Sequence, residues 1–102
     1  MIKVFLKRRV APKNYRRLLG LLTDLRSLAL RQPGYVLGET LIRGTDPVEV
    51  LAIGTWISEE HWMAWSTSQR RIEITDLVSP LLVGAVETTI YKIPTGDAAA
   101  AL

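Results

Sequence analysis

The amino-acid sequence predicts a single α+β domain in which two helices cover one face of a four-stranded antiparallel sheet, in the order βαββαβ. Three observations support this fold class. Four segments alternate apolar and polar residues at the period of a strand, and two segments repeat apolar residues at the period of a helix. Proline, glycine and serine residues mark the boundaries between these segments.

The first strand is expected at residues 2–10 and the first helix at residues 14–31. Along the strand, apolar side chains take alternate positions, but Arg8 falls on their side. A buried charge without a partner is costly, which marks Arg8 as either paired or functional. Pro12 suits the first turn of the helix. The helix then repeats apolar residues at helical spacing, at Tyr15, Leu18, Leu22, Leu25 and Ala29. Its apolar arc extends to further leucines, which predicts contacts beyond its own sheet.

A hairpin follows the first helix. The segment 32–34, Gln-Pro-Gly, ends the helix, because proline disfavours the helical conformation in the residue before it and glycine relaxes the turn. Residues 35–43 and 48–56 have the pattern of two strands. The turn at 44–47 contains Gly, Thr, Asp and Pro, which are suited to a tight connection.

A second helix is expected to begin after Ser58. This serine is a natural N-cap, and the two acidic residues that follow it suit the positive end of the helix dipole. Trp62, Trp65 and Ile72 are expected to share one face of the helix. The polar stretch 66–68 is expected to kink or interrupt it.

One domain is expected over residues 1–94, with a last strand at 86–93 and a flexible C-terminal tail at 95–102. A chain of 102 residues has room for one modest core, yet 48% of the residues are hydrophobic. Both faces of the predicted strands carry large apolar side chains, and a soluble monomer rarely exposes such a patch. We therefore expect a homodimer that pairs through the sheet.

The composition also excludes several classes of function. The absence of cysteine excludes disulfides, thiolate metal sites and cysteine nucleophiles, and one histidine provides no dense cluster of metal ligands. No apolar run is long enough to cross a membrane and no signal peptide is visible, so we expect a cytoplasmic protein without membrane association. Residues 1–31 carry a net charge of +8 and the remainder −5, and these opposite halves are expected to neutralise each other. Nucleic-acid binding is disfavoured because the strand at 48–53 is aliphatic and lacks stacking aromatic residues.

Two stretches carry a resemblance to a known family. One is the close of the long first helix, Gln32-Pro33-Gly34-Tyr35, and the other runs from Thr55 to Trp65, where a strand ending in Trp is followed by a helix that opens with Ser and acids. With these stretches the sequence resembles the antibiotic biosynthesis monooxygenase family over about residues 1–93. The resemblance implies a ferredoxin-like subunit and a dimeric α+β barrel. It leaves the reaction open, because this family contains both cofactor-free oxygenases and haem-degrading enzymes.

Haem chemistry is disfavoured by the same resemblance. The haem-degrading relatives use an Asn on the first strand, a Trp on the second helix and a His about ten residues after that Trp. Trp65 matches the Trp, but the strand position near Leu6 is apolar or basic, and Thr75 stands where the His would be. Without an axial imidazole, haem iron lacks its protein ligand. The expectation is a protein that uses no cofactor.

Five residues are candidates for a functional site. Trp65 would form an aromatic wall, Arg8 would hold an anionic oxygen, and Tyr91 would donate a hydrogen bond to the ligand. Glu39, which interrupts an apolar strand face, and His61, the only histidine, would act as acceptor or general base. Each residue also has a structural interpretation. Trp65 would pack in the core, Arg8 and Glu39 would pair with each other, His61 would cap the helix or face solvent, and Tyr91 would be an ordinary strand residue.

Two functions from different classes remain open. The first is a cofactor-independent monooxygenase that acts on a small electron-rich aromatic or quinol-type substrate. For that chemistry the protein supplies a dry pocket, an oriented substrate and a group that favours the anion which reduces oxygen. The second is a non-catalytic dimeric module that binds a small ligand or has a stress-related role.

Overall fold

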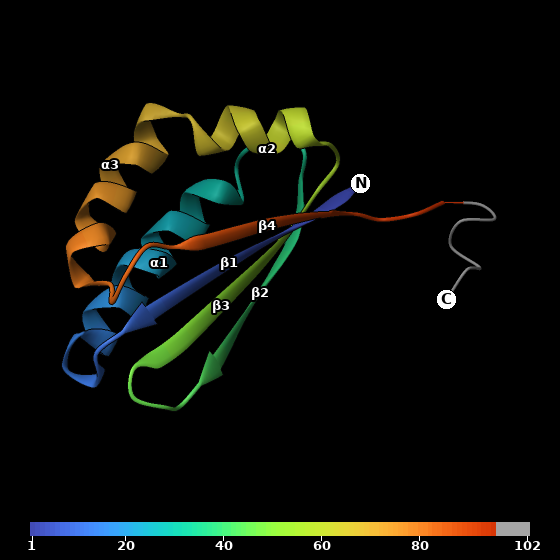
Figure 1. The fold of residues 1–102 in the computed structure, drawn as a ribbon. Helices are drawn as coiled ribbons and strands as arrows, with labels where there is room; N and C mark the ends of the chain where they lie inside the picture. The colour runs from blue at the N-terminus through green and yellow to red at the C-terminus, as the bar shows by residue number, and fades with distance from the viewer. Residues whose placement is uncertain (96–102) are drawn as a thin grey trace.

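The computed structural model describes residues 1–95 and has the predicted fold class. Its elements are β1 (Ile2–Val10), α1 (Tyr15–Ala29), β2 (Tyr35–Arg43), β3 (Val48–Trp56), α2 (Glu59–Ser66), α3 (Gln69–Val78) and β4 (Glu87–Lys92). The four strands form one antiparallel sheet in the order β2-β3-β1-β4. All the helices lie on one side of this sheet (Figure 1), so the ferredoxin-like arrangement is confirmed.

The strand register gives the sheet an inner and an outer face. In β1 the even-numbered residues turn toward the helices, where Ile2, Val4 and Val10 are buried. Residues opposite one another in an antiparallel sheet share a face. The pairing of Val4 with Gly54 therefore places the even-numbered residues of β3 on the inner face, and the pairing of Phe5 with Ile53 places the odd-numbered residues on the outer face.

The core between the sheet and the helices consists of two clusters of buried side chains. The first cluster surrounds Trp56 and Trp62, and the second surrounds Leu18 and Val50. Helix α1 contributes to both clusters through the predicted apolar face, in which Leu18, Leu25 and Ala29 are buried. Part of its wider apolar arc also packs inside the subunit, since Leu21 lies against the second cluster. Contacts with α3 therefore account for some of the apolar surface that suggested a further partner.

The second helical region is interrupted at the polar stretch 66–68, as the sequence predicted. Helix α2 ends at Ser66, and α3 begins again after Ser68, whose Oγ accepts a hydrogen bond of 3.3 Å from the backbone N–H of Arg71. The break changes which residues of α3 face the core. Ile72 is 38% exposed, whereas Val78 at the end of α3 is buried in the core. The expectation that Ile72 shares the face of the tryptophans was wrong, because a continuous helix was assumed.

The boundaries of the remaining elements agree with the sequence to within one or two residues. The first helix is preceded by a 3-10 turn at Pro12–Asn14, with the proline at its start. The last strand covers Glu87–Lys92, inside the predicted range 86–93. The predicted flexible tail lies outside the described residues from position 96 onward. Within residues 1–95, no helix has both the length and the apolar character needed to span a membrane.

We predict that Leu18→Ala lowers the free energy of unfolding by about 2 to 5 kcal/mol, because it removes a fully buried side chain and leaves a cavity. Leu30→Ala at the end of the same helix is the matched control, since Leu30 is 57% exposed, and it should change stability by less than about 0.5 kcal/mol. Chemical denaturation at one protein concentration measures both values. Equal losses in the two variants would contradict the packing of α1 described above.

Candidate functional site

A cavity of about 100 Å³ lies between the inner face of the sheet and the helices. Four aromatic side chains line it, Tyr35, Trp56, Trp62 and Trp65. Three arginines also line it, Arg8, Arg26 and Arg71. Most of the remaining wall is apolar. The cavity therefore combines an aromatic wall with a concentration of positive charge.

The aromatic wall is a set of rings from the end of the hairpin and from α2. Tyr35 begins β2 and packs edge-to-face on Trp56 at the end of β3, with ring centroids 5.3 Å apart. Trp56 in turn meets Trp62 at 5.8 Å. Trp65 lies one turn further along α2 and is 3% exposed. Edge-to-face contacts are an arrangement that aromatic pairs prefer, so Tyr35, Trp56 and Trp62 stabilise one another in the wall.

Arg8 enters the cavity from β1. It lies on the inner face, opposite Val50, and is only 3% exposed. The ion pairs within residues 1–95 join Arg9 and Arg43 to glutamates and do not include Arg8. The side-chain hydrogen bonds of arginine in this part of the chain are made by Arg9, Arg26 and Arg71. Burial lowers the pKa of Arg8 to about 10, and the positive charge of Arg71 adds to that shift. Arg8 and Glu39 therefore do not form the ion pair that the sequence left open.

Arg71 is the second cation of the cavity, and the sequence analysis did not single it out. Its guanidinium carbon lies 5.0 Å from the centroid of the Trp62 ring, and its Nη1 donates a weak hydrogen bond of 3.5 Å to the carbonyl of Ser66. Burial also lowers its pKa. The only available signal was its position in the first turn of α3, where the helix dipole disfavours a cation. The sequence places Arg71 in a first turn only if the helix is interrupted at Thr67 and Ser68.

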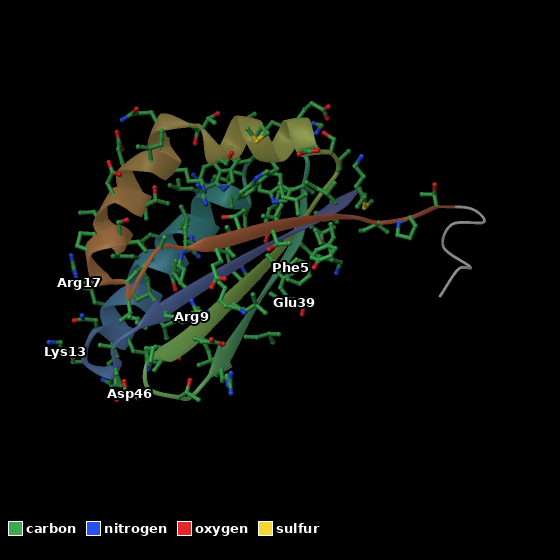
Figure 2. All side chains as sticks on the ribbon, in the orientation of Figure 1. Phe5, Arg9, Lys13, Arg17, Glu39 and Asp46 are labelled. Carbon is green, nitrogen blue, oxygen red and sulfur yellow. The ribbon has the colours of Figure 1, made fainter. Side chains whose placement is uncertain are left out.

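The mouth of the cavity lies between α1 and the edge strand β2. The exposed residues of the lining are Arg26 on α1 and Glu39 and Thr40 on β2. Arg26 spans this gap, because its Nη2 donates a hydrogen bond of 3.2 Å to the carbonyl of Gly38. The pairing of Glu39 with Ile53 directs the Glu39 side chain to the outer face, as Figure 2 shows. Glu39 thus belongs to the rim through its position in β2, while its carboxylate points away from the helices.

The structure does not bring His61 or Tyr91 to this cavity. The Nδ1 atom of His61 lies 2.6 Å from Oγ of Ser58, the N-cap of α2. The His61 ring packs against Gly34, whose φ of +84° and lack of a Cβ allow the close approach. Tyr91 is 59% exposed on the outer face and packs edge-to-face on Phe5 at 5.3 Å. Of the five candidates, the cavity brings together the side chains of Trp65 and Arg8.

The cavity also contains no recognisable metal site. Within residues 1–95, no group of three or more His, Cys, Asp and Glu residues could hold a metal ion. Thr75, which stands where haem-degrading relatives have a His, donates its hydroxyl hydrogen to the carbonyl of Ile72 on its own helix, at 3.1 Å.

The aromatic wall and the arginines together can bind a planar molecule against the tryptophans and hold a negative charge beside the arginines.

Comparison with solved structures finds the same fold in other proteins. An antibiotic biosynthesis monooxygenase superimposes with a TM-score of 0.83 and 14% identity, over 93% of this chain and all of that one. A conserved protein from Methanosarcina mazei Go1 has a TM-score of 0.82 and 23% identity, over 89% of this chain and 90% of that one. SnoaB from Streptomyces nogalater, a cofactor-independent oxygenase, has a TM-score of 0.76 and 14% identity, over 93% of this chain and 95% of that one.

This chain has the antibiotic biosynthesis monooxygenase fold. The family resemblance read from the sequence is confirmed at the level of the fold. No family profile matches the sequence, and no curated protein matches it. Sequence identities of 14 to 23% accompany a shared fold, but they do not show that two proteins share a substrate.

We predict that Arg8→Met raises the free energy of unfolding by about 1 to 4 kcal/mol, because it replaces a buried unpaired charge with an apolar chain of similar length. Burial lowers the pKa of Arg8 to about 10, below that of an exposed arginine. The charge therefore costs stability at every pH below about 10, and this cost is relieved as the pH rises from about 10 toward the pKa of the unfolded side chain.

The gain from Arg8→Met should thus stay constant from about pH 6 to pH 9, where the arginine remains charged in both states. Thermal and denaturant unfolding measure it. Arg16→Met, at an exposed position of α1, is the control and should change stability by less than about 0.5 kcal/mol. A loss of stability in Arg8→Met would show that Arg8 has a partner in the fold.

Proposed function

We propose that this protein is a cofactor-independent monooxygenase that binds a small electron-rich aromatic or quinol-type substrate in the cavity. The observation that carries this proposal is the buried side chain of Arg8, which has no ion-pair partner within residues 1–95, beside a wall of three tryptophans. An aromatic wall orients a planar ring, and a nearby cation stabilises the anion that such a substrate forms on ionisation. The presence of the same fold in SnoaB, a cofactor-independent oxygenase, supports the choice of reaction class.

In this proposal the protein's contribution is electrostatic. A phenol or quinol that loses its proton becomes a strong enough reductant to react with dioxygen. One oxygen atom enters the ring carbon as a carbonyl, the other leaves as water, and the substrate supplies the electrons and both hydrogens of that water. Arg8 and Arg71 favour the ionised form of the substrate, and the apolar wall around Arg8 limits the water that competes for the charge.

The roles predicted for His61 and Glu39 as bases remain predictions. The carboxylate of Glu39 points to the outer face, and His61 is engaged by Ser58. A substrate with a low intrinsic pKa needs no protein base, because the two arginines lower its pKa further. The same geometry supports a second candidate, a non-catalytic module that binds an anionic aromatic ligand. Oxygen consumption separates the two candidates.

We predict that Trp65→Phe lowers the rate of enzyme-dependent oxygen uptake by roughly 10- to 100-fold on a one-ring hydroquinone, because the smaller ring no longer holds the substrate in position. An oxygen electrode measures the rate above the substrate's own autoxidation. Tyr15→Phe, in the second core cluster, is the control and should retain the activity. Saturable binding of the hydroquinone without oxygen uptake above autoxidation would favour the non-catalytic candidate.

We also propose that the protein is a homodimer whose subunits pair through the outer face of the sheet. This face carries large apolar side chains from all four strands, namely Phe5, Leu37, Leu41, Leu51, Ile53 and Tyr91. Leu37, Leu41 and Tyr91 are 46%, 52% and 59% exposed in the single chain. Phe5, Leu51 and Tyr91 also border a hollow on this face, which can receive side chains of a second copy. A stable interface of this kind buries roughly 2,000 Å² or more in total.

The dimer is tested by Leu41→Glu, which places a charge within the proposed interface, on β2. Sedimentation velocity at micromolar concentration should show a dimer for the unmodified chain and a monomer for this variant, because a buried unpaired carboxylate opposes association. Leu77→Glu is the matched control, since Leu77 on α3 is 53% exposed and lies on the helical side of the molecule. A monomeric unmodified chain would contradict the proposal.

A further inference from the structure

The charge of the cavity is unbalanced. Arg8, Arg26 and Arg71 line it, and among residues 1–95 the only acidic residue of the lining is Glu39, whose carboxylate is directed to the other face of the sheet. Arg8 is buried, Arg71 is partly buried, and both line the same cavity. Like charges that share a cavity without a counter-ion destabilise a fold. A bound anion would supply the missing counter-charge.

The donors that face the cavity suit a carboxylate. A guanidinium presents a planar fork of N–H groups, which matches the two oxygens of a carboxylate. Arg71 is oriented before binding, because Trp62 supports its flat face and Ser66 accepts one of its five N–H groups. Arg8 approaches from β1 with its donors unused by other described residues. The single oxygen of a phenolate would leave most of these donors without a partner.

The size and the wall of the cavity restrict the rest of the ligand. A volume of about 100 Å³ is smaller than the roughly 150 Å³ of an apolar cavity that encloses benzene. The cavity itself therefore has room for no more than one ring, and any further part of the ligand would lie in the mouth between α1 and β2. The tryptophan wall favours an aromatic body over a compact inorganic anion such as phosphate.

We infer that the ligand of this cavity is a one-ring aromatic carboxylate, whose carboxylate is held between Arg8 and Arg71 while its ring lies against the tryptophans of α2. This inference rests on the proposed function for the existence of a ligand site, and it concerns the anion that the two arginines bind, which is a carboxylate in place of the phenolate considered above. Arg26 takes no part in holding the carboxylate, since its guanidinium is tethered to Gly38 at the mouth.

The test uses benzoate, neutral benzamide and inorganic phosphate as probes of the unmodified protein. Isothermal titration calorimetry, with tryptophan fluorescence as a second signal, measures each affinity at one ionic strength. Benzoate should bind at least about tenfold more tightly than benzamide, because the amide has the same shape without the charge. Phosphate should neither quench the tryptophan fluorescence nor compete with benzoate. Equal binding of benzoate and benzamide, or competition by phosphate at benzoate-like concentrations, would overturn the inference.

Two variants locate the carboxylate. Arg71→Gln should weaken benzoate binding by roughly 10- to 100-fold while benzamide binding stays the same. Arg71→Lys, which keeps the charge but loses the planar fork, should have an intermediate effect. Arg70→Gln is the matched control, because the neighbouring Arg70 is exposed, and it should bind as the unmodified protein does. Unchanged benzoate binding in a folded Arg71→Gln variant would contradict the assignment.

The outcomes also separate this inference from the proposed function. Oxygen uptake on a neutral hydroquinone together with no preference for benzoate would leave the monooxygenase proposal standing and overturn the carboxylate. Preferential benzoate binding without oxygen uptake on any hydroxybenzoate would support the carboxylate and overturn the monooxygenase proposal. Absence of binding by benzoate, benzamide and hydroquinone alike would overturn both.

Discussion

The burial of Arg8 is the constraint on which the candidate site depends. The two-residue period of a strand places Arg8 on the same face of β1 as Val4 and Val10, and this face packs against the helices. A change of register would turn all these residues to the outer face together, so the cost of burying the charge cannot be avoided locally. The strand can keep this residue because the surrounding core contributes enough apolar burial to offset it. The charge of Arg8 in this cavity opposes folding, and the same charge makes the cavity suited to an anion.

The interruption between α2 and α3 supplies the second half of the site. A continuous helix would direct the residues after Ser66 along the line set by Trp62 and Trp65. Ser68 instead starts a new helix with its own cap, and the first turn of that helix brings Arg71 back over Trp62. The short polar stretch is therefore part of the architecture of the cavity, and its serines and threonine satisfy backbone groups that the break would otherwise expose.

The two faces of the sheet differ in composition and in what they contact. The inner face provides the core and the cavity, and the outer face combines apolar side chains with charged residues at one end of the strands. Arg9, for example, bridges Glu49 and Glu87 across three adjacent strands of that face. Hydrogen bonding to Glu87 raises the pKa of Arg9, although the pair is exposed and contributes little to stability.

The amino-acid sequence by itself determined the secondary structure, the topology and the presence of Arg8 on a buried face, because each depends on local periodicity and on turn chemistry. It could also indicate the interruption of the second helix, since the polar residues 66–68 are next to one another in the chain. The lack of an ion-pair partner for Arg8 within residues 1–95, the orientation of Glu39 and the position of His61 outside the cavity lining depend on residues remote in sequence. Only the tertiary structure decided these, through the pairing of Glu39 with Ile53 and the packing of His61 on Gly34. Arg71 became part of the site for the same reason, because a contact between two helices has no signature in the spacing of either one.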